Sequence, residues 1–287
     1  MRIDAPAKVN LTLRIIGKRL DGYHALESVM QMLTLADTLT IEDADAFEFT
    51  CSVPELAGEE NLVVRAARLL QARSSIPRGV KIHLEKRIPA QAGLGGGSSD
   101  AATTLSALNE FWELRLPPEE LAGMAESLGS DVPFFLDGPT AVVRGRGEEV
   151  TPFIHHTRCY LVLAKPTFGI STAQVYARLH ARDLSPRHAQ PHREETSRML
   201  RALERGDLVD IARALVNDLE GPALALRPEL ITLRERMLQQ GCLNVLLCGS
   251  GSAVLGICQD EATARHAAID LTNDASWTWS GPWLLPA

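Results

Sequence analysis

The sequence lacks the cysteine pattern typical of disulfide-bonded or zinc-binding proteins. Its five cysteines are an odd number, they are widely spread, and no two of them form a C-x-x-C pair. This usage predicts no disulfide framework, zinc site or thiol redox motif. It favours reduced thiols, as in a cytoplasm.

A surplus of positive charge is missing as well. The chain has 29 Lys and Arg against 36 Asp and Glu, so its formal net charge is −7 at pH 7. Proteins that bind duplex nucleic acid usually carry a basic surplus, and we therefore expect no nucleic-acid partner. An anionic small molecule is not excluded, because a few local cations and backbone N–H groups can bind a phosphate.

Long apolar runs are also absent. No segment is long and apolar enough to span a bilayer, and the N-terminus carries no stretch of signal-peptide type. We expect no membrane partner and a cytoplasmic location. The chain has no internal repeat or low-complexity tract. Its 287 residues, 45 % of them apolar, suffice for one large domain or two ordinary ones.

Hydrophobic periodicity predicts strands and helices that mix without a regular βαβ alternation, which favours the α+β class. The expected strands are 7–16, 38–41, 47–51, 80–85, 140–144, 148–152, 159–164, 245–248 and 253–258. The expected helices are 61–72, 98–112, 117–128, 194–205, 207–216, 228–240 and 260–272. The polar segment 183–195 is expected to be a surface loop.

The strongest local feature is a glycine-rich loop, Gly93-Leu94-Gly95-Gly96-Gly97, followed by Ser98 and Ser99 at the start of a predicted helix. Four glycines in five positions let the backbone approach a bulky anion, because no Cβ stands in the way. The two serines can cap the helix and offer hydroxyls to phosphate oxygens or to Mg²⁺. The N–H groups and dipole of the helix favour negative charge there.

A flexible linker is the alternative interpretation, and it is disfavoured because linkers seldom run into a well-patterned helix. Two familiar phosphate loops are excluded by spacing. Ser98 stands where a P-loop requires lysine and where a dinucleotide fingerprint requires its last glycine. The loop therefore belongs to a third class.

This loop resembles the phosphate loop of the GHMP kinases, the family of galactokinase, homoserine kinase and mevalonate kinase. Segment 5–11, Ala-Pro-Ala-Lys-Val-Asn-Leu, resembles the family's first motif, and segment 248–253, Cys-Gly-Ser-Gly-Ser-Ala, resembles its third. The resemblance thus covers the whole chain. It implies an N-terminal ATP-binding domain at 1–152, a smaller C-terminal α/β-plait domain at 153–287, and the cofactors ATP and Mg²⁺.

One branch of the family matches more closely, through segments 18–24, 30–31, 35–37, 129–135 and 168–173. Its acceptor is a cytidine diphosphate-linked methylerythritol, so the resemblance implies direct, in-line transfer to a tertiary hydroxyl. Two departures are mild: that branch often has Asn in place of Asp100, and Met or Ser in place of Cys248. Alternatives are a homoserine, mevalonate or sugar kinase, and a non-catalytic nucleotide-binding regulator. A monomer or a homodimer is expected.

Two residues are the candidate catalytic groups. Asp131 lies in a Gly-x-Asp-x-Pro turn, where a carboxylate can orient the acceptor hydroxyl and take its proton, or can merely cap the turn. Lys8 lies on an alternating strand and can keep a neighbouring carboxylate ionised, or can be an ordinary solvated lysine. The resemblance favours the catalytic role for both.

Five residues are candidates for binding the acceptor. Asn10 shares a strand face with Lys8. The resemblance puts Tyr23 and His24 at the cytidine end, with His24 reading the base by hydrogen bonds; an ordinary turn is the alternative. Tyr176 is either a second stacking face or a helix core residue. Thr172, at the opening of a helix, is a candidate for the diphosphate.

The remaining candidates concern ATP. The phosphate segment comprises Pro89, Ala90, Gln91, Ala92, Gly93, Leu94, Gly95, Gly96, Gly97, Ser98 and Ser99, with Ser99 also a candidate for Mg²⁺ held through ATP. The resemblance puts Asn61 and Leu62 against the adenine, although Asn61 also fits a plain helix N-cap. Lys86 precedes the loop and can approach the nucleotide. The pair His155 and His156 lacks further metal ligands at a useful spacing, so a solvated loop is expected there.

Overall fold

The computed structural model describes residues 1–74, 79–179 and 189–286, and it divides into two compact units. Unit 1 comprises Met1–Ala7, Leu35–Ile88 and Gly95–Asp137. Unit 2 comprises Lys8–Thr34, Pro89–Leu94 and Gly138–Ala287. The units follow packing rather than chain order, and the predicted domain boundary at residue 152 stays a prediction.

Two long strands, β1 (Arg2–Lys18) and β2 (His24–Glu42), contribute residues to both units. The sequence predicts only parts of them, 7–16 and 38–41. The first half of β2 was missed because eight consecutive residues, from Leu26 to Leu33, are all buried. A strand buried on both faces shows no apolar–polar alternation.

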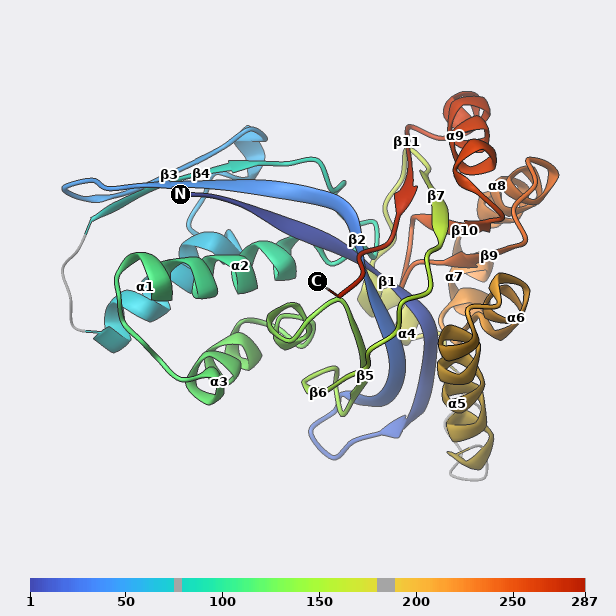
Figure 1. Cartoon of the computed structure of the whole chain (residues 1–287), viewed down its shortest axis with the longest axis horizontal. Helices are drawn as coiled ribbons and strands as arrows, with labels where there is room; N and C mark the ends of the chain where they lie inside the picture. Colours follow the sequence, from blue (N-terminus) through green and yellow to red (C-terminus); the bar gives the residue numbers. More distant parts are fainter. Residues whose placement is uncertain (75–78, 180–188, 287) are drawn as a thin grey trace. The chain divides into compact units, whose positions relative to one another are not determined.

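Unit 1 is a layer of strands covered on one face by helices (Figure 1). Strand β4 (Val80–Glu85) pairs antiparallel with the second half of β2 and parallel with β3 (Phe47–Cys51). The covering helices are α1 (Leu62–Ser74), α2 (Gly96–Phe111) and α3 (Pro118–Leu128), and short 3₁₀ turns lie at Pro54–Leu56 and Pro133–Leu136.

The core of unit 1 follows from residue spacing. In α1, Val63, Ala66 and Leu70 recur at helical intervals and are fully buried. In α2, Leu105 and Leu108 do the same against the inward side chains of β4. Burying each leucine contributes roughly 1.5–3 kcal/mol. The packing fixes the N-terminus of α2, where the glycine loop ends.

Unit 2 contains the first half of β2, most of β1, and three shorter strands beside them. Strand β5 (Thr140–Arg144) pairs antiparallel with β2 and forms a hairpin with β6 (Glu149–Pro152). Strand β8 (Val216–Asn217) runs parallel to β1. The turn that joins β5 to β6 spans residues 145–148.

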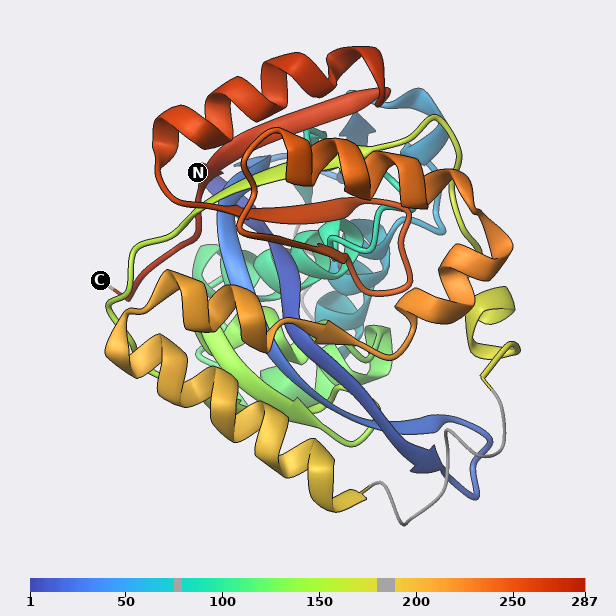
Figure 2. The ribbon, with the colours of Figure 1, turned by 90° about the vertical axis from the view of Figure 1, so that its right-hand side faces the viewer.

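A second, four-stranded antiparallel sheet completes unit 2, in the order β11-β7-β10-β9. Helices α8 and α9 cover one of its faces (Figure 2). The strands are β7 (Tyr160–Lys165), β9 (Asn244–Leu247), β10 (Val254–Cys258) and β11 (Trp277–Pro282). The helices are α4 (Thr172–Tyr176), α5 (Ala189–Arg205), α6 (Leu208–Ala214), α7 (Glu220–Leu226), α8 (Glu229–Gln239) and α9 (Glu261–Asp270), with a 3₁₀ turn at Leu271–Asn273.

The predicted α+β class is confirmed. The surface loop predicted over 183–195 is wrong from residue 189, where α5 begins, and residues 183–188 lie outside the described residues. Across the residues described, no helix has both the length and the apolar character that crossing a membrane requires. The five cysteines, all within the described ranges, are free thiols.

Candidate active site

Lys8 and Asn10 form a buried polar chain on β1 in unit 2. The two side chains share a strand face, and the Lys8 ammonium donates to the Asn10 Oδ1 at 2.7 Å. The Asn10 amide donates in turn to the Ser28 hydroxyl on β2 at 2.8 Å. Lys8 is only 4 % exposed, so the solvated-lysine interpretation is wrong. A charge this deeply buried requires polar or charged partners. Such burial is more typical of a functional lysine than of an ordinary surface lysine.

The first half of the glycine loop lies beside β1 and the late glycine turn in unit 2. The Lys8 N–H donates to the Leu94 carbonyl at 2.9 Å. Gly93 has a φ of 77°, and a Cβ there would lie 1.9 Å from the Cys248 carbonyl oxygen. Only glycine fits such a position. The glycine loop and the late glycine turn, far apart in sequence, therefore meet through their backbones.

A polar pocket of about 530 Å³ opens at this junction. The Thr172 and Ser250 hydroxyls share a hydrogen bond of 2.8 Å in its wall. Exposed hydroxyls of this kind suit phosphate oxygens. The sequence prediction included Thr172 but missed Ser250 as a binding residue. The lining residues are Gln91, Gly93, Gly169, Ile170, Ser171, Thr172, Gln174, Ser250 and Gly251.

Aromatic residues predicted for the cytidine end come together in unit 2. The His24 and Tyr176 rings are 5.0 Å apart between centroids and inclined by 34°. Burial lowers the pKa of His24, and the nearby Lys18 lowers it further. The imidazole is therefore neutral at pH 7, with one ring nitrogen as donor and the other as acceptor. Tyr23 is 56 % exposed.

The second half of the glycine loop starts α2 in unit 1. Gly95 has a φ of 72° and precedes the first helical residue, Gly96. The Gly97 Cα lies close to Leu62, because an added Cβ would be 3.7 Å from the Leu62 Cδ1. Ser98 is half-buried, whereas Ser99 is fully buried and its hydroxyl has no hydrogen-bond partner within the described structure.

These features fit the phosphates of ATP. Gly95 precedes a 16-residue helix whose first two residues are Gly96 and Gly97, so free N–H groups at the helix start belong to backbone without Cβ atoms. The unpartnered Ser99 hydroxyl is an oxygen of the kind that Mg²⁺ takes. Within the described residues no group of three His, Cys, Asp or Glu side chains could hold a metal by itself.

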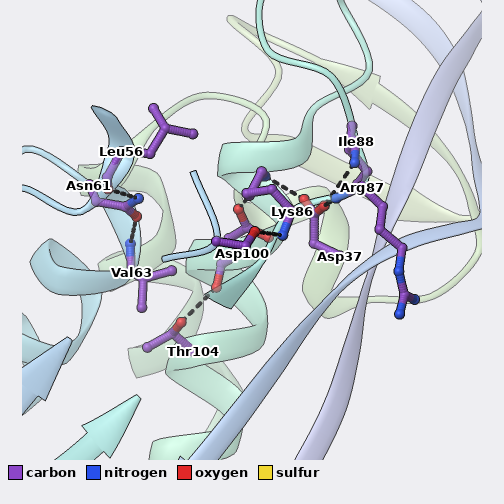
Figure 3. Close-up of polar contacts among 10 residues, drawn as sticks. Asp37, Leu56, Asn61, Val63, Lys86, Arg87, Ile88, Asp100 and Thr104 are labelled. Atoms are coloured by element: carbon purple, nitrogen blue, oxygen red, sulfur yellow. Dashed lines mark hydrogen bonds and ion pairs between the residues drawn. The ribbon is translucent and has the colours of Figure 1, made fainter. Parts of the chain in front are cut away.

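Lys86 lies beneath the start of α2, between two buried aspartates (Figure 3). Its ammonium donates to Asp37, and to the Asp100 Oδ2 at 2.8 Å. The Asp37 Oδ1 also accepts from the Arg87 and Ile88 N–H groups, at 2.5 and 2.8 Å. A Cβ at Gly96 would be 3.3 Å from the Lys86 Nζ. The sequence prediction included Lys86 but missed both carboxylates.

Burial and charge act in opposite directions in this cluster. Burial opposes the charge of Lys86, but Asp100 and Asp37 outweigh it and raise the lysine's pKa. Burial raises the pKa of Asp100 to about 7, even though Lys86 pulls it down. Two carboxylates sharing one ammonium would leave a net negative charge, which a proton on Asp100 relieves.

Asn61 caps α1. Its Oδ1 accepts from the Val63 N–H at 2.9 Å and its amide donates to the Leu56 carbonyl at 2.8 Å (Figure 3). The N-cap interpretation is confirmed, and the adenine contact stays a prediction for Asn61 and for Leu62.

Asp131 is half-buried in the turn that follows α3. The Val132 N–H donates to the Gly129 carbonyl at 3.2 Å, and the buried side chains of Val132 and Phe134 anchor the chain directly after Asp131. The carboxylate is thus held on a rigid segment of unit 1. Its catalytic role stays a prediction.

The solvated loop expected at His155 is wrong. His155 is 3 % exposed, and its Nε2 lies 3.0 Å from the Gln31 Oε1 and 3.1 Å from the Thr140 hydroxyl. Its Nδ1 accepts from the Thr157 N–H at 3.2 Å. The residue is part of a buried polar network in unit 2, whereas His156 is exposed.

Known proteins match this arrangement over nearly the whole chain. Family models for the GHMP kinases N terminal domain and the GHMP kinases C terminal match residues 61–139 and 199–273. The fold and the glycine loop are thus those of a GHMP kinase. Members of this class use ATP as the phosphate donor.

The particular relatives are more specific. A 4-diphosphocytidyl-2-C-methyl-D-erythritol kinase of Pelotomaculum thermopropionicum is 44 % identical over 92 % of this chain and 91 % of its own. Its counterpart in Moorella thermoacetica is 44 % identical over 94 % of both chains. A crystal structure of 4-(cytidine 5'-diphospho)-2C-methyl-D-erythritol kinase superposes with a TM-score of 0.85 at 40 % identity, covering 99 % of both chains.

The chain belongs to the 4-diphosphocytidyl-2-C-methyl-D-erythritol kinase family, and it is an enzyme. The non-catalytic regulator considered from the sequence is therefore rejected. A homoserine kinase from Cytophaga hutchinsonii has a TM-score of 0.77 but only 16 % identity, which shows a shared fold alone.

Proposed function

We propose that the chain transfers the γ-phosphoryl group of ATP to the 2-hydroxyl of 4-diphosphocytidyl-2-C-methyl-D-erythritol, in the methylerythritol phosphate route to isoprenoid precursors. The main support for this proposal is the 44 % identity, over 92 % of the chain, to a kinase named for this alcohol. One homoserine kinase and one mevalonate kinase of the same fold are only 16 and 18 % identical, so the cytidylated alcohol is the better-supported acceptor.

On the donor side, the phosphates of ATP bind at the glycine loop, segment 89–99, and the N-terminus of α2. The support is the Cβ-free backbone at Gly95–Gly97 and the orphan N–H groups of the helix. Mg²⁺, bound with the nucleotide, would neutralise charge on the phosphates, and Ser99 is its candidate protein ligand. Asn61, Leu62 and Lys86 are the proposed residues on the nucleotide side.

On the acceptor side, Tyr23, His24 and Tyr176 take the cytosine, and Thr172 takes the diphosphate. The neutral imidazole of His24 supports the first part, because it can offer both a donor and an acceptor to a base edge. The hydroxyl pair of Thr172 and Ser250 supports the second. Asn10 holds the alcohol itself.

The chemistry is a direct displacement without a phospho-enzyme. Asp131 accepts the proton of the attacking hydroxyl and orients its lone pair towards the γ-phosphorus. The buried Lys8 ammonium, fixed by Asn10, favours the ionised forms of the base and of the reacting oxygen. Positioning and charge stabilisation then account for the rate.

The proposed setting is a reducing cytoplasm, with the enzyme as a monomer or homodimer and without nucleic acid. Its free cysteines and its net charge of −7 support this setting.

The deciding experiment is an ADP-release assay with one preparation and four acceptors. We expect turnover with 4-diphosphocytidyl-2-C-methyl-D-erythritol and none above background with homoserine, mevalonate or galactose. Mass spectrometry should locate the new phosphate on the 2-hydroxyl. Turnover of another alcohol at a higher kcat/KM would overturn the assignment.

A further inference from the structure

Arg146 covers one face of the exposed Tyr23 ring. The guanidinium carbon lies 5.1 Å from the ring centroid, a distance typical of cation–π contact. Yet Tyr23 keeps 56 % exposure, an unusual state for a large aromatic side chain. One ring face is thus occupied by a planar cation while much of the side chain remains open.

The arginine is held in place by its own turn. Gly145 and Gly147 flank it with φ values of 72° and 124°, and the Gly147 N–H closes the turn on the Arg144 carbonyl at 3.0 Å. The Glu148 carboxylate accepts from the Arg146 N–H and lies 3.8 Å from the Arg146 Nε. A further bond of 2.8 Å, from the Leu26 N–H to the Gly145 carbonyl, ties the turn to β2.

Tyr23 is held by the turn between β1 and β2. Its N–H donates to the Asp21 Oδ1 at 3.1 Å, and its carbonyl accepts from the Arg19 N–H at 2.8 Å. The Arg19 guanidinium then binds the Asp21 Oδ2 at 3.0 Å and lies 4.0 Å from the Glu148 Oε1. Glu148 therefore stands between the arginines of both turns and links them.

We propose that Arg146 is a positioning residue for the acceptor, which fixes the Tyr23 ring so that its open face can stack on the pyrimidine base. The inference rests on the proposed function, which puts cytidine at Tyr23. An exposed tyrosine without a partner samples several rotamers, and the entropy lost when a base orders it weakens binding. A guanidinium on one face orders the ring beforehand, which strengthens stacking on the other.

The surroundings argue against a direct grip of Arg146 on the substrate's diphosphate. The Glu148 carboxylate lies against the guanidinium and offsets its charge. Desolvation raises the pKa of Asp21, but the Tyr23 N–H, Arg19 and, last, Arg146 outweigh it and lower the pKa. This carboxylate therefore lies close to the Arg146 guanidinium. A site for a dianion would not place carboxylates there.

The test is a double-mutant cycle on the steady-state kinetics of the full-length enzyme. Arg146→Met keeps the aliphatic stem and removes the guanidinium. We expect it to raise KM for the cytidylated alcohol roughly fivefold, with kcat and KM for ATP within twofold of wild type. Arg146→Lys should recover part of the loss. In a Tyr23→Leu background, Arg146→Met should have no further effect.

Arg213→Met is the matched control, because it removes one exposed positive charge elsewhere in unit 2 and should leave all constants unchanged. An equal KM increase in the Tyr23→Leu background would show direct substrate contact and overturn the inference. An unchanged KM in Arg146→Met would also overturn the inference, but it would leave the proposed function intact. A wild-type enzyme inactive on the cytidylated alcohol would overturn both.

Discussion

At the residue scale, the catalytic proposal depends on two charged side chains, and the sequence predicted the surroundings of one of them better than those of the other. Lys8 is 4 % exposed and its ammonium is hydrogen-bonded to Asn10. The alternation of apolar and polar residues along the strand did not predict that Lys8 is buried. Asp131 is half-buried in a turn, as the Gly-x-Asp-x-Pro pattern suggests. A buried lysine costs stability unless it is paired, so a function is the better explanation for Lys8.

The first residue-scale prediction tests Asp131. Asp131→Asn is nearly isosteric, so it should keep the turn and both binding sites while removing the proton acceptor. We expect kcat to fall by about 10²–10⁴-fold, with the thermal midpoint and ATP affinity close to wild type. All three quantities should be measured on one preparation. A stable, ATP-binding variant with near-normal kcat would mean that Asp131 only caps its turn.

The second concerns Asp100, whose pKa burial raises from 3.8 to about 7. The folded state then binds a proton more tightly than the unfolded state. Its stabilising contribution is present below pH 3.8 and is lost as the pH rises through 7. Asp100→Asn keeps an acceptor for Lys86 but cannot ionise. We expect it to abolish this decline between pH 4 and 8, measured as urea midpoints of the two proteins.

The matched control for Asp100 is Asp43→Asn, at an exposed position directly after β2. It should leave the pH profile of the midpoint unchanged. If Asp100→Asn also keeps the wild-type profile, Asp100 is ionised in the folded protein and the cluster carries a net negative charge.

At the element scale, sequence patterns predicted short strands well, and long strands or elements that contain Gly and Pro poorly. The predicted strands 47–51, 80–85 and 140–144 agree with β3, β4 and β5. Helix α7 was missed because Gly221 and Pro222 interrupt its first turn, and β11 because Gly281 and Pro282 end it. No local pattern says that Gly93 meets Cys248, or which aspartates meet Lys86, because those contacts depend on packing.

The element-scale prediction tests the junction of the two glycine segments. Gly93→Ala places a Cβ against the Cys248 carbonyl at a φ of 77°, so we expect a loss of roughly 1–3 kcal/mol or more in unfolding free energy. Gly123→Ala is the control, since it lies within α3 with nothing within 4 Å. It should stabilise by about 0.5–1 kcal/mol. Urea unfolding measures both, and equal effects would contradict the packed junction.

At the scale of the whole molecule, three separated motifs were enough to predict the family, because each supplies backbone or charge that the chemistry needs. The C-terminal segment shows what such motifs leave out. The Gln31 amide donates to the Leu284 carbonyl at 2.8 Å, and the Trp283 indole donates to the Thr157 carbonyl at 2.7 Å. His155 packs edge-on against Trp283, with ring centroids 5.5 Å apart. A buried network without a sequence motif thus fastens the end of unit 2.

That network makes the folded chain sensitive to acid through His155. Burial lowers the histidine's pKa from 6.5 to about 4, and the neighbouring His156 adds to the effect. The unfolded state therefore binds the proton more tightly, and the contribution to stability is present above pH 6.5 and lost as the pH falls through 4.

His155→Gln keeps an N–H donor for the Gln31 side-chain Oε1 but does not titrate. We expect it to flatten the fall of the urea midpoint between pH 6.5 and 4, although repacking lowers the midpoint at pH 7. His266→Gln, at a side chain 69 % exposed on α9, is the control and should keep the wild-type slope. A slope that His155→Gln leaves unchanged would mean that His155 takes up its proton at the same pH in the folded and unfolded states, so that its burial does not make the chain sensitive to acid.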